Sequence, residues 1–84
     1  MDFSVVQPEQ FLHSAMFRQD EFLDGIRRHN WEQYRGRPVL VRGCGEVITP
    51  PWAYMAIVAR LAGVARSVRY GNEHDNVVVY RQNV

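Results

Sequence analysis

Lysine is absent from this sequence, cysteine occurs only once, and there is no long hydrophobic segment. Without lysine, the Gly43-Cys44-Gly45 segment and Thr49 do not match a phosphate-binding loop, which ends in Gly-Lys followed by Ser or Thr. A single cysteine excludes a disulfide within the chain and indicates a reducing compartment or no redox role. The longest uncharged run, residues 47–59, is shorter than the roughly 20 apolar residues of a membrane-spanning helix.

The length of 84 residues indicates one domain, 1–84, and the amino end shows no apolar leader. We therefore expect a soluble cytoplasmic protein with no membrane association and no cofactor. Within it, residues 1–16 are expected to be a peripheral segment and residues 17–84 the compact core. A chain this short buries only about 60–65% of the surface that its unfolded form exposes, and such domains often depend on a partner.

Charge is distributed unevenly along the chain, although the net charge is only +1. Residues 1–34 contain six acidic residues and three arginines, whereas residues 35–84 contain three acidic residues and seven arginines. An arginine-based face for phosphate or nucleic acid requires clustered arginines, and these are scattered along the sequence. Nucleic-acid binding is therefore not expected, and no class of small-molecule ligand is indicated.

An amphipathic helix is predicted over residues 19–30, because Phe22, Ile26 and His29 recur at i, i+4 and i+7. Three shorter elements accompany it: an edge strand over residues 2–6, a helical turn over 8–12, and a helix extension or aromatic corner over 31–34.

The second half of the chain predicts a parallel crossover unit followed by a hairpin strand. Residues 39–41 form an apolar run that is typical of a strand buried on both faces. Thr49 and Pro50 suit the N-cap and first position of a helix that ends near Gly63. The remaining strands are expected over residues 64–70 and 76–81. The predicted fold class is α/β, bordering on α+β: a small mixed three- to four-stranded sheet with a βαβ crossover, a C-terminal hairpin strand and two main helices.

The crossover helix is apolar on nearly every side, and Arg60 is its only charged residue. A surface helix in a small α/β domain should have a polar face. We therefore expect one side to pack on the sheet and the other on the first helix or on a partner chain. Trp52, Tyr54 and Met55 are the candidate interface residues, although the two aromatic residues also suit the core.

Several short motifs lie between residues 17 and 81: Trp31-x-x-Tyr34, Val39-Leu-Val-Arg-Gly-Cys-Gly45, Pro51-x-Ala-Tyr54, Tyr70-Gly71 and Val79-Tyr80-Arg81. In these motifs the chain resembles the carboxyl-terminal half of a family of small bacterial proteins, domain of unknown function 2480. Members of that family carry two similar halves, so the resemblance implies that a homodimer supplies the missing half. It implies no activity.

Cys44 is the strongest candidate for a reactive residue, because a thiol near the amino end of a helix can become a better nucleophile. The carboxyl ends of parallel strands meet at one sheet edge, where ligands often bind. Cys44, Glu73 and His74 can lie together there, and such a set suffices chemically for a transition metal. The spacing matches no zinc motif, however, and a lone cysteine also suits a buried structural position. The related family often has a second cysteine where this chain has His74.

Two interpretations follow. We expect a non-catalytic module that forms homo-oligomers, with a homodimer favoured, through the crossover helix. The alternative is a thiol- or metal-dependent site at the sheet edge. Its candidate catalytic residues are Cys44 and His74, and its candidate metal ligands are Cys44, His74 and Glu73.

Overall fold

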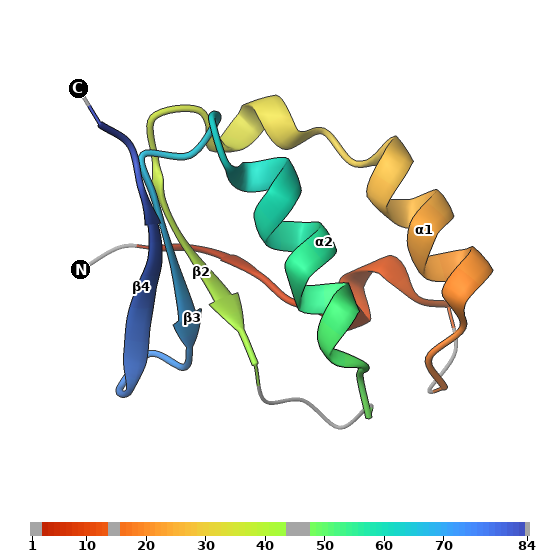
Figure 1. Ribbon diagram of the computed structural model, residues 1–84. Coiled ribbons are helices and arrows are strands. Elements are labelled where there is room, and N and C mark those ends of the chain that lie inside the picture. The colour runs from red at the N-terminus through yellow and green to blue at the C-terminus, as the bar shows by residue number, and fades with distance from the viewer. Residues whose placement is uncertain (1–2, 14–15, 44–47, 84) are drawn as a thin grey trace.

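The computed structural model describes residues 3–13, 16–43 and 48–83. Its elements are, in chain order, β1 (Ser4–Val6), the 3₁₀ turn η1 (Pro8–Phe11), α1 (Gln19–Arg28), the 3₁₀ turn η2 (Trp31–Tyr34), β2 (Pro38–Arg42), α2 (Pro51–Leu61), β3 (Ser67–Gly71) and β4 (Asn76–Arg81). The predicted α/β class is confirmed (Figure 1).

The four strands form one mixed sheet in the order β1-β2-β3-β4. β2 is parallel to both of its neighbours, β1 and β3, whereas β4 is antiparallel to β3. The parallel pairing of β2 with β3, with α2 between them in the chain, confirms the predicted crossover unit. The hairpin between β3 and β4 is also confirmed, and β1 supplies a fourth strand at one edge of the sheet.

Both helices cover the same face of the sheet (Figure 1), and the hydrophobic core lies between the two layers. The strand residues Val39, Val41 and Val68 are fully buried in this core. The helix residues that pack with them are Phe22, Ile26, Ala53, Ile57 and Leu61. Leu40 is fully buried as well, although strand alternation directs it to the opposite face. The apolar run in β2 therefore marks a strand that is covered on both faces, as predicted.

The amino-terminal segment was predicted to be peripheral, but two of its described residues, Val6 and Phe11, lie in the core. Val6 of β1 pairs with Val41 of β2 and is fully buried. Phe11 of η1 is also buried, and its ring lies 5.8 Å from the rings of both Phe22 and Trp31. These residues are buried because β1 pairs with β2, which would otherwise be an edge strand.

Two helix boundaries differ from the prediction. α2 begins at Pro51 with Pro50 as its N-cap residue, not at Pro50 with Thr49 as the cap. A residue that precedes proline avoids the helical region, so Pro50 is extended (ψ 148°) and the helix starts only after it. α1 ends at Arg28 because His29 is extended (ψ 143°), and the turn η2 is therefore separate from the helix.

Candidate functional site

An apolar groove of about 530 Å³ lies between α2 and the β3–β4 hairpin. Its lining residues come from both layers of the fold: Pro51, Tyr54, Met55, Val58, Ala59, Tyr70 and Val79. None of them is charged. The groove forms because α2 lies over the centre of the sheet and leaves the β4 side of the same face open.

Two tyrosines form one wall of the groove. The rings of Tyr54 and Tyr70 meet edge to face with their centroids 5.2 Å apart, and the Tyr54 hydroxyl donates a hydrogen bond to the Gly43 carbonyl at 3.1 Å. A Cβ atom on Gly43 would lie only 2.6 Å from the Tyr70 ring. Glycine at this position therefore lets the Tyr70 ring lie across the end of β2, where it supports Tyr54.

The three candidate interface residues lie on two sides of α2. Tyr54 and Met55 line the groove, and the Met55 side chain is 70% exposed. Trp52 instead packs edge to face against Phe22 of α1, with ring centroids 5.6 Å apart. α1 and its neighbouring residues therefore cover one apolar side of α2, whereas the single chain leaves the Met55 side open.

The neighbouring β4 forms one of the two edges of the sheet, opposite β1. Its residues Val77, Val78 and Val79 are 59%, 40% and 47% exposed. A register shift opposite β3 makes Val79 an extra residue, which joins the groove lining. The sequence predicted β4 as a strand but not as an exposed apolar edge. The three consecutive valines could have indicated such an edge. In an ordinary strand with one face covered, apolar residues alternate with polar ones.

The carboxyl ends of β2 and β3 meet at one edge, as the parallel topology predicted. Arg42 at the end of β2 forms an ion pair with Glu73 in the loop after β3. The hydrogen bond from Arg42 lowers the pKa of Glu73, and the Arg42 charge acts in the same direction. Glu73, a candidate metal ligand, is therefore engaged by a guanidinium group in this structure.

The loop after β3 is organised by Asn72. Its side-chain oxygen accepts hydrogen bonds from the backbone N–H groups of His74 and Asp75, both at 2.8 Å. The His74 side chain is exposed, and Cys44 lies outside the described residues. Among the described residues, no group of three or more His, Cys, Asp or Glu side chains is placed to hold a metal ion. The described residues at this edge therefore give no support to a thiol- or metal-dependent site.

His29 and Tyr34 form a polar contact beside the rings of Phe11 and Trp31. The His29 Nε2 atom lies 2.6 Å from the Tyr34 hydroxyl, and the His29 ring contacts the rings of Phe11 and Trp31 edge to face. Burial among these rings lowers the pKa of His29 and raises the pKa of Tyr34. Folding therefore favours the neutral imidazole relative to the unfolded chain.

Acidification should destabilise the domain through His29. Because the pKa of His29 is lower in the folded chain than in the unfolded chain, the unfolded chain binds the proton more readily. The stabilising contribution is complete above the unfolded value of about 6.5 and is lost as the pH falls through the folded value. Between about pH 7.5 and about pH 5.5, the midpoint of thermal unfolding should fall less for His29→Gln than for the wild type. His13→Gln, at an exposed position, controls for the loss of an imidazole, and equal losses in His29→Gln and the wild type would contradict the prediction.

The fold and its groove define a two-layer α/β domain, in which one sheet face carries both helices and a free apolar edge. The chain belongs to the family described as protein of unknown function (DUF2480), whose model matches residues 4–83. This match confirms the resemblance read from the short motifs and extends it to include β1. No curated protein and no solved structure matches the chain significantly. No helix in the described part of the chain combines the length and apolar character that a bilayer crossing requires.

Proposed function

We propose that this domain is a non-catalytic interaction module that forms a homodimer through β4 and the adjacent groove. The observation that carries the proposal is the free edge strand, whose three central valines are exposed beside a groove lined without charge. An edge strand presents unpaired N–H and C=O groups to any strand that can align with it. Proteins normally protect such edges with charged residues or cover them, and the middle of β4 has no charged residue.

A second copy of the same strand is a suitable partner. In an antiparallel pair related by a two-fold axis, Val78 of each copy can lie opposite Val78 of the other, with Val77 opposite Val79, and the two sheets become continuous. The Arg81 residues then lie at opposite ends of the strand pair, about 20 Å apart, so their charges do not oppose each other. A parallel pair would place them side by side, which is unfavourable.

The groove gives the dimer its apolar contact. Met55 and Val79 flank it from the two layers, and burial of a methionine or valine side chain stabilises a complex by up to about 1.5–3 kcal/mol. Tyr54 and Tyr70 are already held by their mutual contact and by the bond to Gly43. The wall therefore needs little ordering when the partner binds, which lowers the cost of association.

Val79→Asp should dissociate the dimer. The wild-type chain at high micromolar concentration is expected to elute with twice the 9.8-kDa chain mass in size exclusion with light scattering. A carboxylate at Val79 would be buried between two copies without a partner, which typically weakens association by at least about 3 kcal/mol, more than a hundredfold. The variant should therefore elute as a single chain.

Val5→Asp provides the matched control. Val5 is a valine on β1, the opposite edge of the same sheet, and it is 37% exposed. This variant should keep the wild-type mass, and circular dichroism should show that both variants are folded. A monomeric wild type, or a dimer that dissociates in Val5→Asp but persists in Val79→Asp, would overturn the proposed interface.

A further inference from the structure

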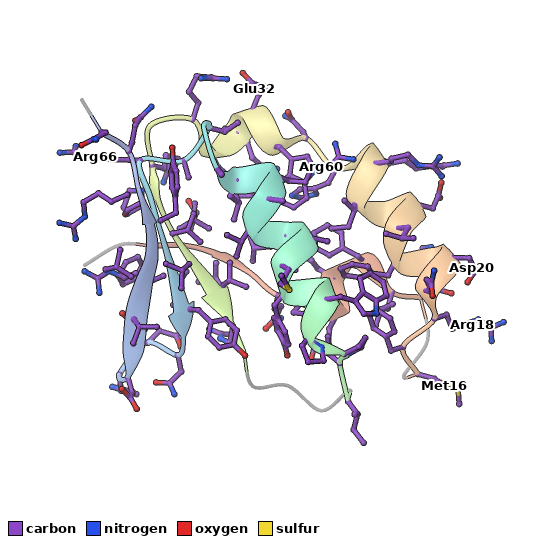
Figure 2. All side chains as sticks on the ribbon, viewed as in Figure 1. Met16, Arg18, Asp20, Glu32, Arg60 and Arg66 are labelled. Carbon is purple, nitrogen blue, oxygen red and sulfur yellow. The ribbon has the colours of Figure 1, made fainter. Side chains whose placement is uncertain are left out.

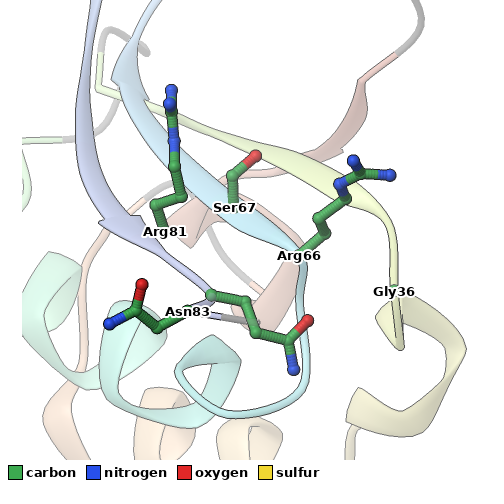
Figure 3. Close-up of a pocket in the computed structure, with 6 residues that line it drawn as sticks. Gly36, Arg66, Ser67, Arg81 and Asn83 are labelled. Carbon is green, nitrogen blue, oxygen red and sulfur yellow. The ribbon is translucent and has the colours of Figure 1, made fainter.

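A second hollow, of about 810 Å³, lies at the end of the sheet where β3 begins and β4 ends. Its lining is entirely different from that of the groove: Gly36, Arg66, Ser67, Arg81, Gln82 and Asn83. Arg66 and Arg81 extend on either side of the Ser67 hydroxyl (Figure 3). The lining therefore combines two cations, one hydroxyl and two amides, and it contains no acidic residue.

The backbone fixes this arrangement. Ser67 pairs directly with Arg81 across the β3–β4 hairpin, and the Gln82 N–H donates a 2.8 Å hydrogen bond to the Arg66 carbonyl. The Arg66 N–H in turn donates to the Arg37 carbonyl at 2.9 Å. Arg66 and Arg81 are distant in the sequence, but the hairpin register makes them neighbours. Two of the ten arginines therefore line one hollow at this end of the sheet.

Neither arginine of this hollow has a side-chain partner within the described part of the chain. The ion pairs there involve Arg27, Arg28, Arg35 and Arg42, and Arg37 donates to the Ser4 hydroxyl. No described side chain compensates the charges of Arg66 and Arg81. An anion in the hollow would compensate both of them.

We propose that this hollow binds the phosphate group of a small phosphorylated molecule. A guanidinium group presents its N–H donors in a planar fork that matches two oxygens of a phosphate. A phosphate monoester carries about −1.5 to −2 charges near pH 7, which matches the two arginines, and the Ser67 hydroxyl can donate a further bond. The site needs only one copy of the chain, so it goes beyond the proposed dimer.

The remainder of the lining indicates the class of molecule. The hollow is larger than a single phosphate ion, and no aromatic ring lines it, so it has no platform on which a nucleobase could stack. The Gln82 and Asn83 amides offer both donors and acceptors. These groups suit the hydroxyls of a polar molecule, and we therefore assign the site to a hydroxylated phosphate monoester rather than to a nucleotide.

The experiment is an amide-resonance titration of the isotope-labelled full chain with inorganic phosphate and with glycerol phosphate, at low and constant ionic strength. Saturable shifts are expected at Ser67, Gln82 and their neighbours, and tighter binding of the ester would support the monoester assignment. The double variant Arg66→Gln/Arg81→Gln should bind at least about tenfold more weakly, because each lost bond to a charged group typically costs that factor or more.

The matched control is Arg18→Gln/Arg60→Gln, which removes the same charge elsewhere. Arg18 lies at the opposite end of the molecule from Arg66, and Arg60 lies on α2 (Figure 2). This control and the monomeric Val79→Asp variant should both keep wild-type affinity, so a failure of the dimer would not obscure the result. Shifts that do not saturate, shifts that occur equally near Arg18, or unchanged affinity in a folded Arg66→Gln/Arg81→Gln variant would overturn the proposal.

Discussion

Phe22→Ala should lower the free energy of unfolding by about 3–5 kcal/mol. The Phe22 side chain is fully buried, and three aromatic rings surround it: Phe11 at 5.8 Å, Phe17 at 5.1 Å and Trp52 at 5.6 Å between ring centroids. Phe22 joins η1, α1 and α2 into one core. Rigid rings collapse poorly into the space that alanine leaves, so the cost should lie in the upper part of this range.

A loss of this size is large for so small a domain. At about 0.05–0.15 kcal/mol per residue, a chain of 84 residues has a total stability of about 4–13 kcal/mol. The midpoint of thermal unfolding should therefore fall by about 12–40 °C, at about 4–8 °C for each kcal/mol. The adjacent Leu23→Ala is the control, because Leu23 is exposed and its loss should cost less than about 1 kcal/mol. Similar losses for the two variants would contradict the packing described for α1.

Gly71→Ala should be the second most damaging change, at about 3 kcal/mol or more. Gly71 ends β3 with φ +139°, a conformation that residues with a side chain rarely adopt. A Cβ atom there would lie 2.3 Å from the Asp75 carbonyl oxygen and 2.9 Å from the Asn76 Cα. Both are backbone atoms of the β3–β4 hairpin, so the turn itself would have to move.

Gly36→Ala should separate the two causes of that loss, which are the backbone strain of a positive φ and the steric clash of the added Cβ atom. Gly36 also has a positive φ of 71°, but no atom lies within 4 Å of a Cβ built on it. Its substitution should cost only the backbone strain, about 1–2 kcal/mol. Chemical denaturation of both variants gives the comparison. A cost for Gly71→Ala no larger than that for Gly36→Ala would show that the hairpin accommodates the extra atom.

The elements with a strong local pattern were predictable from the sequence. The valine-rich stretches of β2 and β4 have few alternatives to a strand, and the recurrence of Phe22 and Ile26 fixed the buried side of α1. The start of α2 was misplaced because Pro50 is followed by a second proline, whose effect on the preceding residue outweighs the capping preference of Thr49. The role of residues 1–16 was missed because only three residues of β1 enter the sheet, which is too short a pattern to show burial.

The candidate sites were less predictable, because they depend on register and on the direction of side chains. Apolar residues on every side of α2 predicted contacts on two sides, but not that Trp52 would face α1 while Met55 faced the groove. Arg66 and Arg81 become neighbours only through the pairing of Ser67 with Arg81, which no local pattern encodes. The meeting of Arg42 with Glu73 was predictable, because parallel strands necessarily end at the same edge.

The short length of β1 has a consequence for aggregation. β1 pairs with β2 over three residues only, Ser4 to Val6, and a strand this short at the margin of a sheet opens more readily than its centre. Each opening would uncover β2, whose middle is the uninterrupted sequence Val39-Leu40-Val41. An uncovered strand edge without charge can pair with the strands of other chains. Pairing with β1 therefore shields this stretch of β2 from other chains, in addition to the contribution of β1 to the core.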